Sequence, residues 1–136
     1  EWRNLAPSAD IVTEVKNDLR DYAHAAHAQG IANDHLVLDV GIGFGKKFEQ
    51  NYPLLAGLDQ LRDLGFPLLV GTSRKSFIGR TLAVDGKDAL ADQRLNGSVA
   101  AATASVLKGA HVVRVHDVKA AVEAVKIADE ILRFSK

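Results

Sequence analysis

The sequence predicts an α/β fold in which parallel strands alternate with amphipathic helices. Three short segments, 36–39, 68–70 and 111–115, are rich in leucine and valine. They lack the polar–apolar alternation of a strand with one face in water, so each is typical of a strand buried on both faces of a parallel sheet. Each is followed by a stretch with helical spacing of its apolar residues, which indicates a βα rhythm along the chain.

The first helix is expected to precede the first strand. Ser8 is placed to cap it, and Gly30 is a fitting C-terminal stop. Its apolar face follows helical spacing and consists of Ile11, Val15, Leu19, Tyr22 and Ala26. The strand at 36–39 then leads directly into the glycine-rich run 41–46, Gly-Ile-Gly-Phe-Gly-Lys.

A second helix is expected to open at Asn51 and Pro53, because proline is tolerated in a first helical turn. It ends at Gly65, and its inward face consists of Leu54, Leu55, Leu58 and Leu61. The strand at 68–70 then feeds the polar loop 71–76, Gly-Thr-Ser-Arg-Lys-Ser.

The rest of the chain predicts two more helices around the last strand. An alanine-rich run from Gly97 to Lys108 is expected to be helical and to close at Gly109. After the strand at 111–115, Asp117 is placed to cap a last helix. The residues expected to face inward from that helix are Val118, Val122, Val125 and either Ile131 or Leu132.

These elements leave two architectures open, a doubly wound open sheet or part of a (β/α)₈ barrel. About three strands and four helices cannot close a barrel, which takes about 250 residues, whereas this chain has 136. No linker or low-complexity segment divides the chain, so residues 1–136 are expected to form a single, partial domain.

The composition excludes several classes of function. The 17 basic and 17 acidic residues cancel, so no electrostatic argument favours nucleic acid or an acidic membrane. No apolar stretch approaches the roughly 20 residues needed to span a bilayer. The absence of cysteine rules out disulfides and thiolate catalysis, and it fits a reducing cytoplasm, where we expect the chain to act.

Polar residues gather at the carboxyl ends of the predicted strands. Asp39 ends the first strand, the loop 71–76 follows the second, and Arg114 and His116 alternate at the end of the third. Because ligands bind at that edge in both architectures, we predict the functional site there. Asp39 could bind the donor groups of a heterocycle, or it could instead cap the glycine turn that follows it.

Arg114 and His116 point to the same side of their strand, since side chains alternate along a strand. A bidentate guanidinium beside a histidine is well suited to phosphate or pyrophosphate. The alternative is an internal ion pair of Arg114 with Asp39 or Asp117.

Two loops add other side chains to this edge. Phe44 lies among glycines with no core to fill, so it could stack on an aryl substrate. Lys75 could supply positive charge to a carbonyl or an anion, and Ser76 could begin a helix whose free N–H groups meet a carboxylate. The alternatives are a mobile glycine loop and a solvated basic turn.

Other polar residues are expected to be structural. His24 and His27 are three positions apart without an evident third ligand, so we predict a solvated surface pair rather than a metal site. His35 and His111 precede strands at their amino ends, away from the predicted site. Arg94 is expected to help open the third helix rather than to act in catalysis.

Each motif alone is a moderate signal, but their order along the chain is specific for one family. The segments 38–46, 67–76 and 114–118, with Arg94 and Gly97-Ser98 between them, resemble the dihydropteroate synthase family. The Ser-Arg-Lys-Ser and Arg-Val-His-Asp pieces are the most distinctive, and the likeness runs through residues 9–135. One departure is Val40, where the family usually has proline. The resemblance implies the C-terminal portion of a (β/α)₈ TIM barrel, incomplete alone.

The resemblance also implies an activity, the condensation of 6-hydroxymethyl-7,8-dihydropterin pyrophosphate with p-aminobenzoate in folate biosynthesis. This transferase reaction releases pyrophosphate, and the family is the target of sulfonamides. Carried over by motif, the site residues are Asp39 and Gly71 for the pterin, Phe44 and Ser76 for the aminobenzoate, Lys75 for both, and Arg114 and His116 for the leaving pyrophosphate, with Mg²⁺ assisting.

Part of the implied active site has no counterpart in this sequence. The family's first strands and two long loops, which provide the main Mg²⁺ ligand, are not represented, so we expect little or no synthase activity from the chain alone. Residues 1–7 resemble no such loop and could be junction sequence. The expected protein partner is a second copy of the chain or a missing N-terminal half.

Two other interpretations stay open. A pterin-binding methyltransferase domain shares the barrel, although its chemistry uses no pyrophosphate and so leaves Arg114 and His116 unexplained. A non-catalytic half-barrel, which binds pterin weakly or buries its open sheet edges by association, is the alternative from another class.

Overall fold

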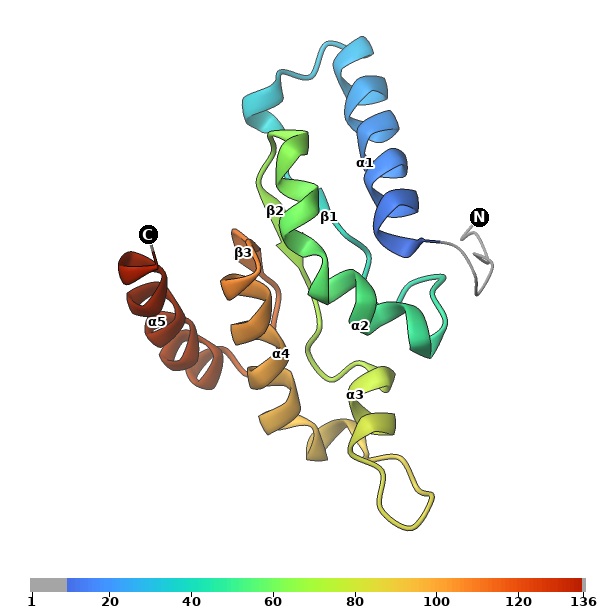
Figure 1. Ribbon diagram of the computed structural model, residues 1–136, viewed down its shortest axis with the longest axis vertical. Coiled ribbons are helices and arrows are strands. Elements are labelled where there is room, and N and C mark those ends of the chain that lie inside the picture. Colours follow the sequence, from blue (N-terminus) through green and yellow to red (C-terminus); the bar gives the residue numbers. More distant parts are fainter. Residues whose placement is uncertain (1–9, 136) are drawn as a thin grey trace.

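The computed structural model describes residues 10–135 and shows a three-stranded parallel sheet with helices packed along it (Figure 1). The predicted junction segment 1–7 lies outside the described residues. The strands are β1 (Leu38–Asp39), β2 (Leu68–Val70) and β3 (Val112–Val113). The α-helices are α1 (Ile11–Ala28), α2 (Phe48–Ala56), α3 (Ser76–Thr81), α4 (Leu95–Leu107) and α5 (Val118–Phe134). The 3₁₀ helices are η1 (Asn33–His35), η2 (Leu58–Leu64) and η3 (Ala91–Gln93).

The sheet has the strand order β1-β2-β3 with parallel pairing throughout. Asp39 lies opposite Leu69, which in turn lies opposite Val112. Since paired residues of neighbouring strands point to the same face, these three side chains form one row across the sheet. The predicted α/β class with three parallel strands is confirmed, although β3 is shorter than the predicted strand at 111–115.

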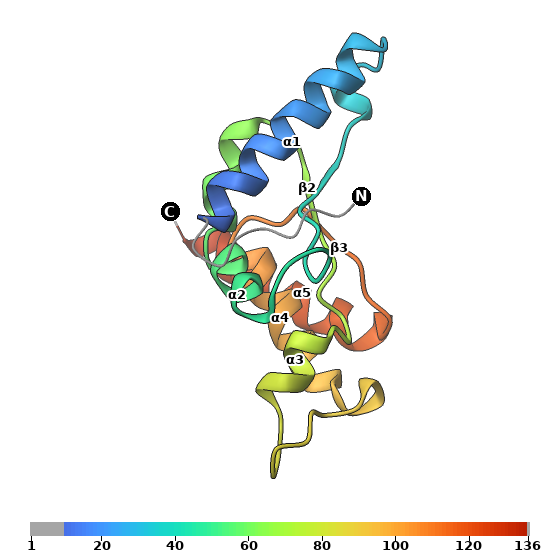
Figure 2. The same cartoon turned by 90° about the vertical axis from the view of Figure 1, so that its right-hand side faces the viewer.

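One face of the sheet carries the hydrophobic core. Leu38, Leu68 and Val70 are at most 6% exposed and belong to one cluster with buried residues of α1, α2 and η2. Figure 2 shows α1 and α2 on one side of the strands, where they cover this face. The core therefore lies between the sheet and the helices.

The opposite face of the sheet is exposed, and we call it the open face. It is formed by Val37, Asp39, Leu69, Val112 and Arg114. Val37 is 51% exposed and Val112 is 42% exposed. The prediction that the strands are buried on both faces is therefore wrong for this chain, because the helices within residues 10–135 pack against the other face.

α1 begins at a different cap from the predicted one. Asp10, not Ser8, is the N-cap, because its side chain accepts hydrogen bonds from the backbone N–H groups two and three residues further on. Tyr22, predicted to face inward, is 67% exposed, and Ala23 lies in the core instead. The buried residues of this helix are Ile11, Val12, Val15, Leu19 and Ala23.

The second helix begins earlier than predicted and changes type along its length. α2 starts at Phe48 rather than at Asn51, because the side chain of Gln50 accepts a hydrogen bond from the backbone N–H of Lys47 at 2.8 Å and caps the first turn. At Gly57 the chain passes into η2. The predicted inward face is confirmed, with Leu54, Leu58 and Leu61 fully buried and Leu55 partly buried.

α5 turns a different face inward from the predicted one. Ala121 and Ala128 are its buried residues, and α4 is the element against which it packs. Small side chains let the two helices approach closely, which decides the inward face here. Four residues predicted to face inward are at least 39% exposed, namely Val118, Val122, Ile131 and Leu132.

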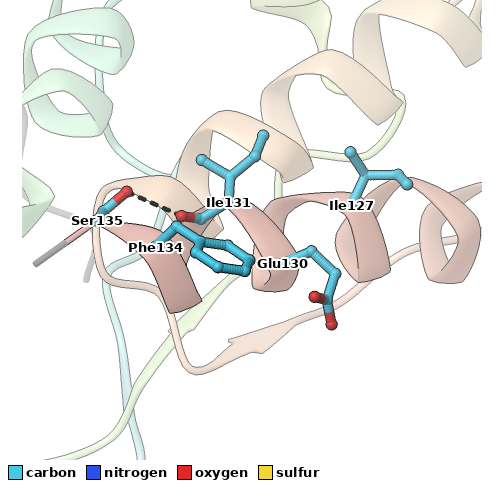
Figure 3. A pocket seen from close by; sticks show the side chains of 5 residues that line it. All are labelled: Ile127, Glu130, Ile131, Phe134 and Ser135. Carbon is cyan, nitrogen blue, oxygen red and sulfur yellow. Dashed lines mark hydrogen bonds between the residues drawn. The ribbon is translucent and has the colours of Figure 1, made fainter.

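The outward side of α5 carries an apolar stripe. Ile127, Ile131 and Phe134 project from it and line a shallow hollow, which Ser135 borders by donating a hydrogen bond to the Ile131 carbonyl at 2.9 Å (Figure 3). Phe134 is 84% exposed. None of the helices within residues 10–135 has both the length and the apolar character that crossing a membrane requires.

Candidate functional site

The segment after β1 folds as a hydrogen-bonded turn next to Asp39. Gly41, Gly43 and Gly45 have φ angles of 68°, 74° and 59°, a region that favours glycine. The Asp39 carboxylate accepts a hydrogen bond from the backbone N–H of Gly41 at 2.8 Å, which is the turn-capping contact expected as the alternative to ligand binding. The Lys46 ammonium donates to the Gly41 carbonyl at 2.7 Å, and burial lowers the pKa of Lys46. Asp39 is thereby fixed at the end of β1.

Arg114 lies beside Asp39 on the open face. Its Nη2 atom is 3.6 Å from Oδ2 of Asp39, so the internal ion pair predicted as an alternative is present. Both side chains remain accessible, with exposed fractions of 58% for Arg114 and 44% for Asp39. A Cβ atom on Gly71 would stand 3.0 Å from Arg114 Nη2, so the guanidinium lies directly over the Gly71 backbone. The structure thus brings Asp39, Gly71 and Arg114 together.

Lys75 connects this group to Phe44. Its Nζ atom lies 3.5 Å from the centroid of the Phe44 ring, a cation–π contact between the two loops. Partial burial lowers the pKa of Lys75 and the charge of Arg114 lowers it further, whereas Asp39 acts in the opposite direction. Space for the lysine is left by Gly43, whose Cβ would stand 3.0 Å from Lys75 Cδ.

His116 contacts the loop after β2. Its backbone N–H donates a hydrogen bond to Ser73 Oγ at 3.2 Å, and its ring Nδ1 lies 3.0 Å from the same oxygen. Ser73 is 4% exposed, so its hydroxyl is a fixed partner. The imidazole of His116 is therefore held through Nδ1.

A second link joins the same two loops one residue further along. Arg74 donates two hydrogen bonds to Asp117, from Nη2 to Oδ1 at 2.7 Å and from Nε to Oδ2 at 3.1 Å. The hydrogen bond from Arg74 lowers the pKa of Asp117, and the carboxylate raises that of Arg74. Asp117 takes the predicted N-cap position of α5, but its side chain makes no capping hydrogen bond and binds Arg74 instead.

Sequence reasoning did not single out Ser73, Arg74 and Asp117 as partners across the two loops. The signal was available in their positions, since Ser73-Arg74 and His116-Asp117 are consecutive pairs of complementary groups at strand ends that share one edge. Lys46, which closes the glycine turn, was likewise read only as part of the glycine-rich run.

Ser76 is the predicted site residue that these contacts leave out. It begins α3 directly after Lys75, as predicted, and it is exposed. Arg94 has the expected structural role, since it donates to the carbonyls of Ala89 at 2.7 Å and Arg74 at 2.8 Å. His111 is structural too, because its Nδ1 accepts a hydrogen bond from the backbone N–H of Leu68 at 3.1 Å.

The described part of the chain does not supply a metal centre. Within residues 10–135, no three His, Asp or Glu side chains are grouped so that they could hold a metal ion. Asp39, the carboxylate next to Arg114, is engaged by Gly41 and by that arginine. These residues do not fit a resident Mg²⁺ ion.

Comparison with known proteins identifies the family of the chain. The chain matches the family of pterin binding enzymes over residues 2–116. It is 42% identical to the dihydropteroate synthase of Escherichia coli K12 over 123 residues, which are 90% of this chain and 42% of that protein.

Two solved structures extend the comparison to three dimensions. The Yersinia pestis dihydropteroate synthase in a sulfonamide drug complex superposes with a TM-score of 0.85 and 41% identity, over 94% of this chain and 45% of that one. The Xanthomonas albilineans enzyme in complex with 7,8-dihydropteroate gives a TM-score of 0.85 and 40% identity, over 94% of this chain and 48% of that one.

The chain spans less than half the length of each of these relatives. This share and the three-stranded parallel sheet confirm the predicted fold class, a portion of a (β/α)₈ TIM barrel. The chain belongs to the pterin-binding enzyme family, and its relatives within that family are dihydropteroate synthases.

Proposed function

We propose that this chain forms the pterin- and pyrophosphate-binding half of a dihydropteroate synthase, which joins 6-hydroxymethyl-7,8-dihydropterin pyrophosphate to p-aminobenzoate. The observation that carries the proposal is the position of Arg114, which lies over Gly71 and pairs with Asp39 at the carboxyl ends of the strands. Lys75 is near enough for its charge to interact with both Arg114 and Asp39. The relatives described with a sulfonamide drug and with 7,8-dihydropteroate support the same substrate classes.

The pterin end of the site is assigned to Asp39 and Gly71. The carboxylate accepts hydrogen bonds from the amino and ring N–H groups of the pterin, and the glycine lets the flat ring lie against the backbone. Arg114 now lies in that space, 3.0 Å from where a Gly71 Cβ would stand. Pterin binding therefore requires the guanidinium to swing away from Gly71, toward the pyrophosphate.

The aryl end of the site is assigned to the two loops that follow β1 and β2. Phe44 forms a wall for the aminobenzoate ring, and Lys75 lies between that ring and the pterin, consistent with its contact with Phe44. Ser76 meets the aminobenzoate carboxylate at the start of α3.

The proposed reaction is a displacement at the methylene carbon of the pterin. The bond from this carbon to the pyrophosphate oxygen breaks, and its electron pair leaves with the pyrophosphate. Arg114 and His116 stabilise that charge as it develops. The pterin ring delocalises the positive charge left behind, the neutral aryl amine then forms the C–N bond, and its proton is released. No residue of the chain forms a covalent intermediate.

The family resemblance implies Mg²⁺, but the described residues do not fit the ion, so no step of this mechanism passes through it. Groups from both halves of a barrel must be held together for turnover. We therefore expect the purified chain to bind ligand and to show little synthase activity, and family-like turnover would contradict this expectation.

Isothermal titration calorimetry with a pterin pyrophosphate analogue tests the assignment. The wild-type chain should bind, Asp39→Ala should lose binding, and Asp21→Ala, an exposed change on α1, should bind like wild type. Absence of binding by the wild-type chain, or equal binding by both variants, would overturn the proposal that this half assembles the pterin site.

The exposed apolar residues of the open face support an additional proposal about partners. Val37, just before β1, is 51% exposed, and Val112 of β3 is 42% exposed, which favours burial against a second copy or a complementary half-barrel. Sedimentation velocity over a range of concentrations tests this. A mass that stays monomeric at high concentration would exclude the second copy as the partner.

A further inference from the structure

Arg74 is the most constrained residue of the loop after β2. Its φ angle is 58°, in the left-handed region of the backbone. Residues other than glycine and asparagine rarely adopt this region. Its backbone N–H donates to Ser98 Oγ at 2.8 Å, and its carbonyl accepts a hydrogen bond from Arg94 Nη1 at 2.8 Å. Its side chain makes the bidentate pair with Asp117. Ser98, Arg94 and Asp117, which all lie outside the loop, thus hold one strained residue.

Both neighbours of Arg74 contact residues of the proposed site. Ser73, on one side, holds the ring of His116, and Lys75, on the other, lies against Phe44. The backbone angle at Arg74 sets the direction of the chain between them, so it decides where the Lys75 side chain starts. On the other loop, Asp117 directly follows His116, so the ion pair also fixes the backbone that carries the imidazole.

We propose that Arg74 and Asp117 are positioning residues of the site: their bidentate ion pair, together with the left-handed backbone at Arg74, sets the relative positions of Lys75 and His116. The inference rests on the proposed function, because Lys75 and His116 are the groups assigned there to the two substrates. The ion pair joins the loop assigned to the aryl substrate to the loop assigned to the leaving pyrophosphate. In this role the two side chains bind each other rather than the ligand.

A set of variants separates this role from a role in folding. Arg74→Gly removes the side chain while glycine accepts the φ of 58° without steric cost, so we expect the backbone conformation and the fold to be retained. Asp117→Asn keeps the shape but removes the charge, and Arg74→Lys keeps a charge but cannot form the two parallel hydrogen bonds. Arg133→Ala, which breaks the exposed pair with Glu130 on α5, is the matched control.

Two measurements on the full chain are made for each variant. Calorimetry gives the affinity for inorganic pyrophosphate, and NMR gives the ring signals of His116 and the side-chain signals of Lys75 in the absence of ligand. We expect Arg74→Gly and Asp117→Asn to weaken pyrophosphate binding about tenfold and to move both sets of signals. Arg74→Lys should give an affinity for pyrophosphate and NMR shifts between those of these variants and wild type. Arg133→Ala should change neither the affinity nor the signals.

The double variant Arg74→Gly/Asp117→Asn should lose no more affinity than either single variant, because both remove the same ion pair. Folded variants with unchanged His116 and Lys75 signals would overturn the positioning role, as would additive losses in the double variant. If the wild-type chain does not bind pyrophosphate, the proposed function fails, whereas the NMR signals still decide whether Arg74 and Asp117 position the two side chains.

Discussion

The two faces of the sheet are built from the same three strands and serve different ends. On the covered face, Leu38, Leu68 and Val70 are at most 6% exposed and pack against helices. On the open face, Val112 is 42% exposed and Arg114 is 58% exposed. Neighbouring residues of one strand therefore point to opposite faces, one into the closed core and the next into the accessible site.

Stability and ligand binding therefore depend on different faces of the sheet. Removing a group from the covered face leaves a cavity in a packed cluster, so the cost appears in the free energy of unfolding. Removing a group from the open face takes away contacts that are already shared with water, so the cost appears in ligand binding. Unfolding and binding measurements therefore distinguish the two faces.

The largest expected effect is the loss of a core side chain from η2. Leu61→Ala should lower the free energy of unfolding by about 3 kcal/mol, because Leu61 is fully buried in the core. Val112→Ala, on the open face, should cost less than about 1 kcal/mol. Chemical denaturation measures both, and equal losses would mean that the open face is covered in solution.

A pair of glycines compares the faces by adding an atom instead of removing one. In Gly57→Ala the new Cβ would stand 2.7 Å from Val12 Cγ2, in the packing between η2 and α1, so we expect a loss of about 1–3 kcal/mol in stability. The change in the midpoint of chemical denaturation gives this value. An unchanged midpoint would show that α1 shifts freely at this contact.

Gly71→Ala is the matching change next to the open face. Its Cβ would stand 3.0 Å from Arg114 Nη2, and this flexible side chain can move aside. We expect nearly wild-type stability and at least about tenfold weaker binding of a pterin pyrophosphate analogue in calorimetry, because the pterin loses its approach to the backbone. Unchanged affinity would remove Gly71 from the pterin site.

The smallest effect is expected in the titration of Lys75. Burial and Arg114 lower the pKa of this lysine below its ordinary value of 10.5, so its charge is lost at a lower pH than that of a free lysine. NMR of the lysine side-chain carbons, assigned with Lys75→Arg, measures the midpoint. Arg114→Gln should raise the midpoint by removing a like charge, and Asp39→Asn should lower it. The opposite pair of shifts would contradict the assigned neighbours.

Much of the fold could be predicted because strand and helix signals are local. The glycine and leucine patterns located η2 and its end, and the strand ends located Asp39, Arg114 and His116 at one edge. The inward face of α5 could not be predicted, because alanine contacts with α4, rather than hydrophobicity, decide it. The open face could not be predicted either, since the valines that line it are those of a strand buried on both faces.

The candidate site was predicted as a group of residues but not as a network. Asp39, Gly71 and Arg114 are brought together as expected of neighbouring strand ends. The partner of Asp117 was missed because a capping aspartate and an ion-paired aspartate look the same in sequence. Only the arrangement of the two loops in space distinguishes them.

The cross-links between the two loops also have a consequence for the order of folding. The bonds from Ser73 to His116 and from Arg74 to Asp117 each join residues 43 positions apart in the chain. Helices form quickly from local contacts, whereas contacts between distant residues must first overcome the entropy of closing a long loop. During synthesis the loop after β2 is made before its partners, so we expect Lys75 and its neighbours to reach their final geometry only after Asp117 has been made and β3 has joined the sheet.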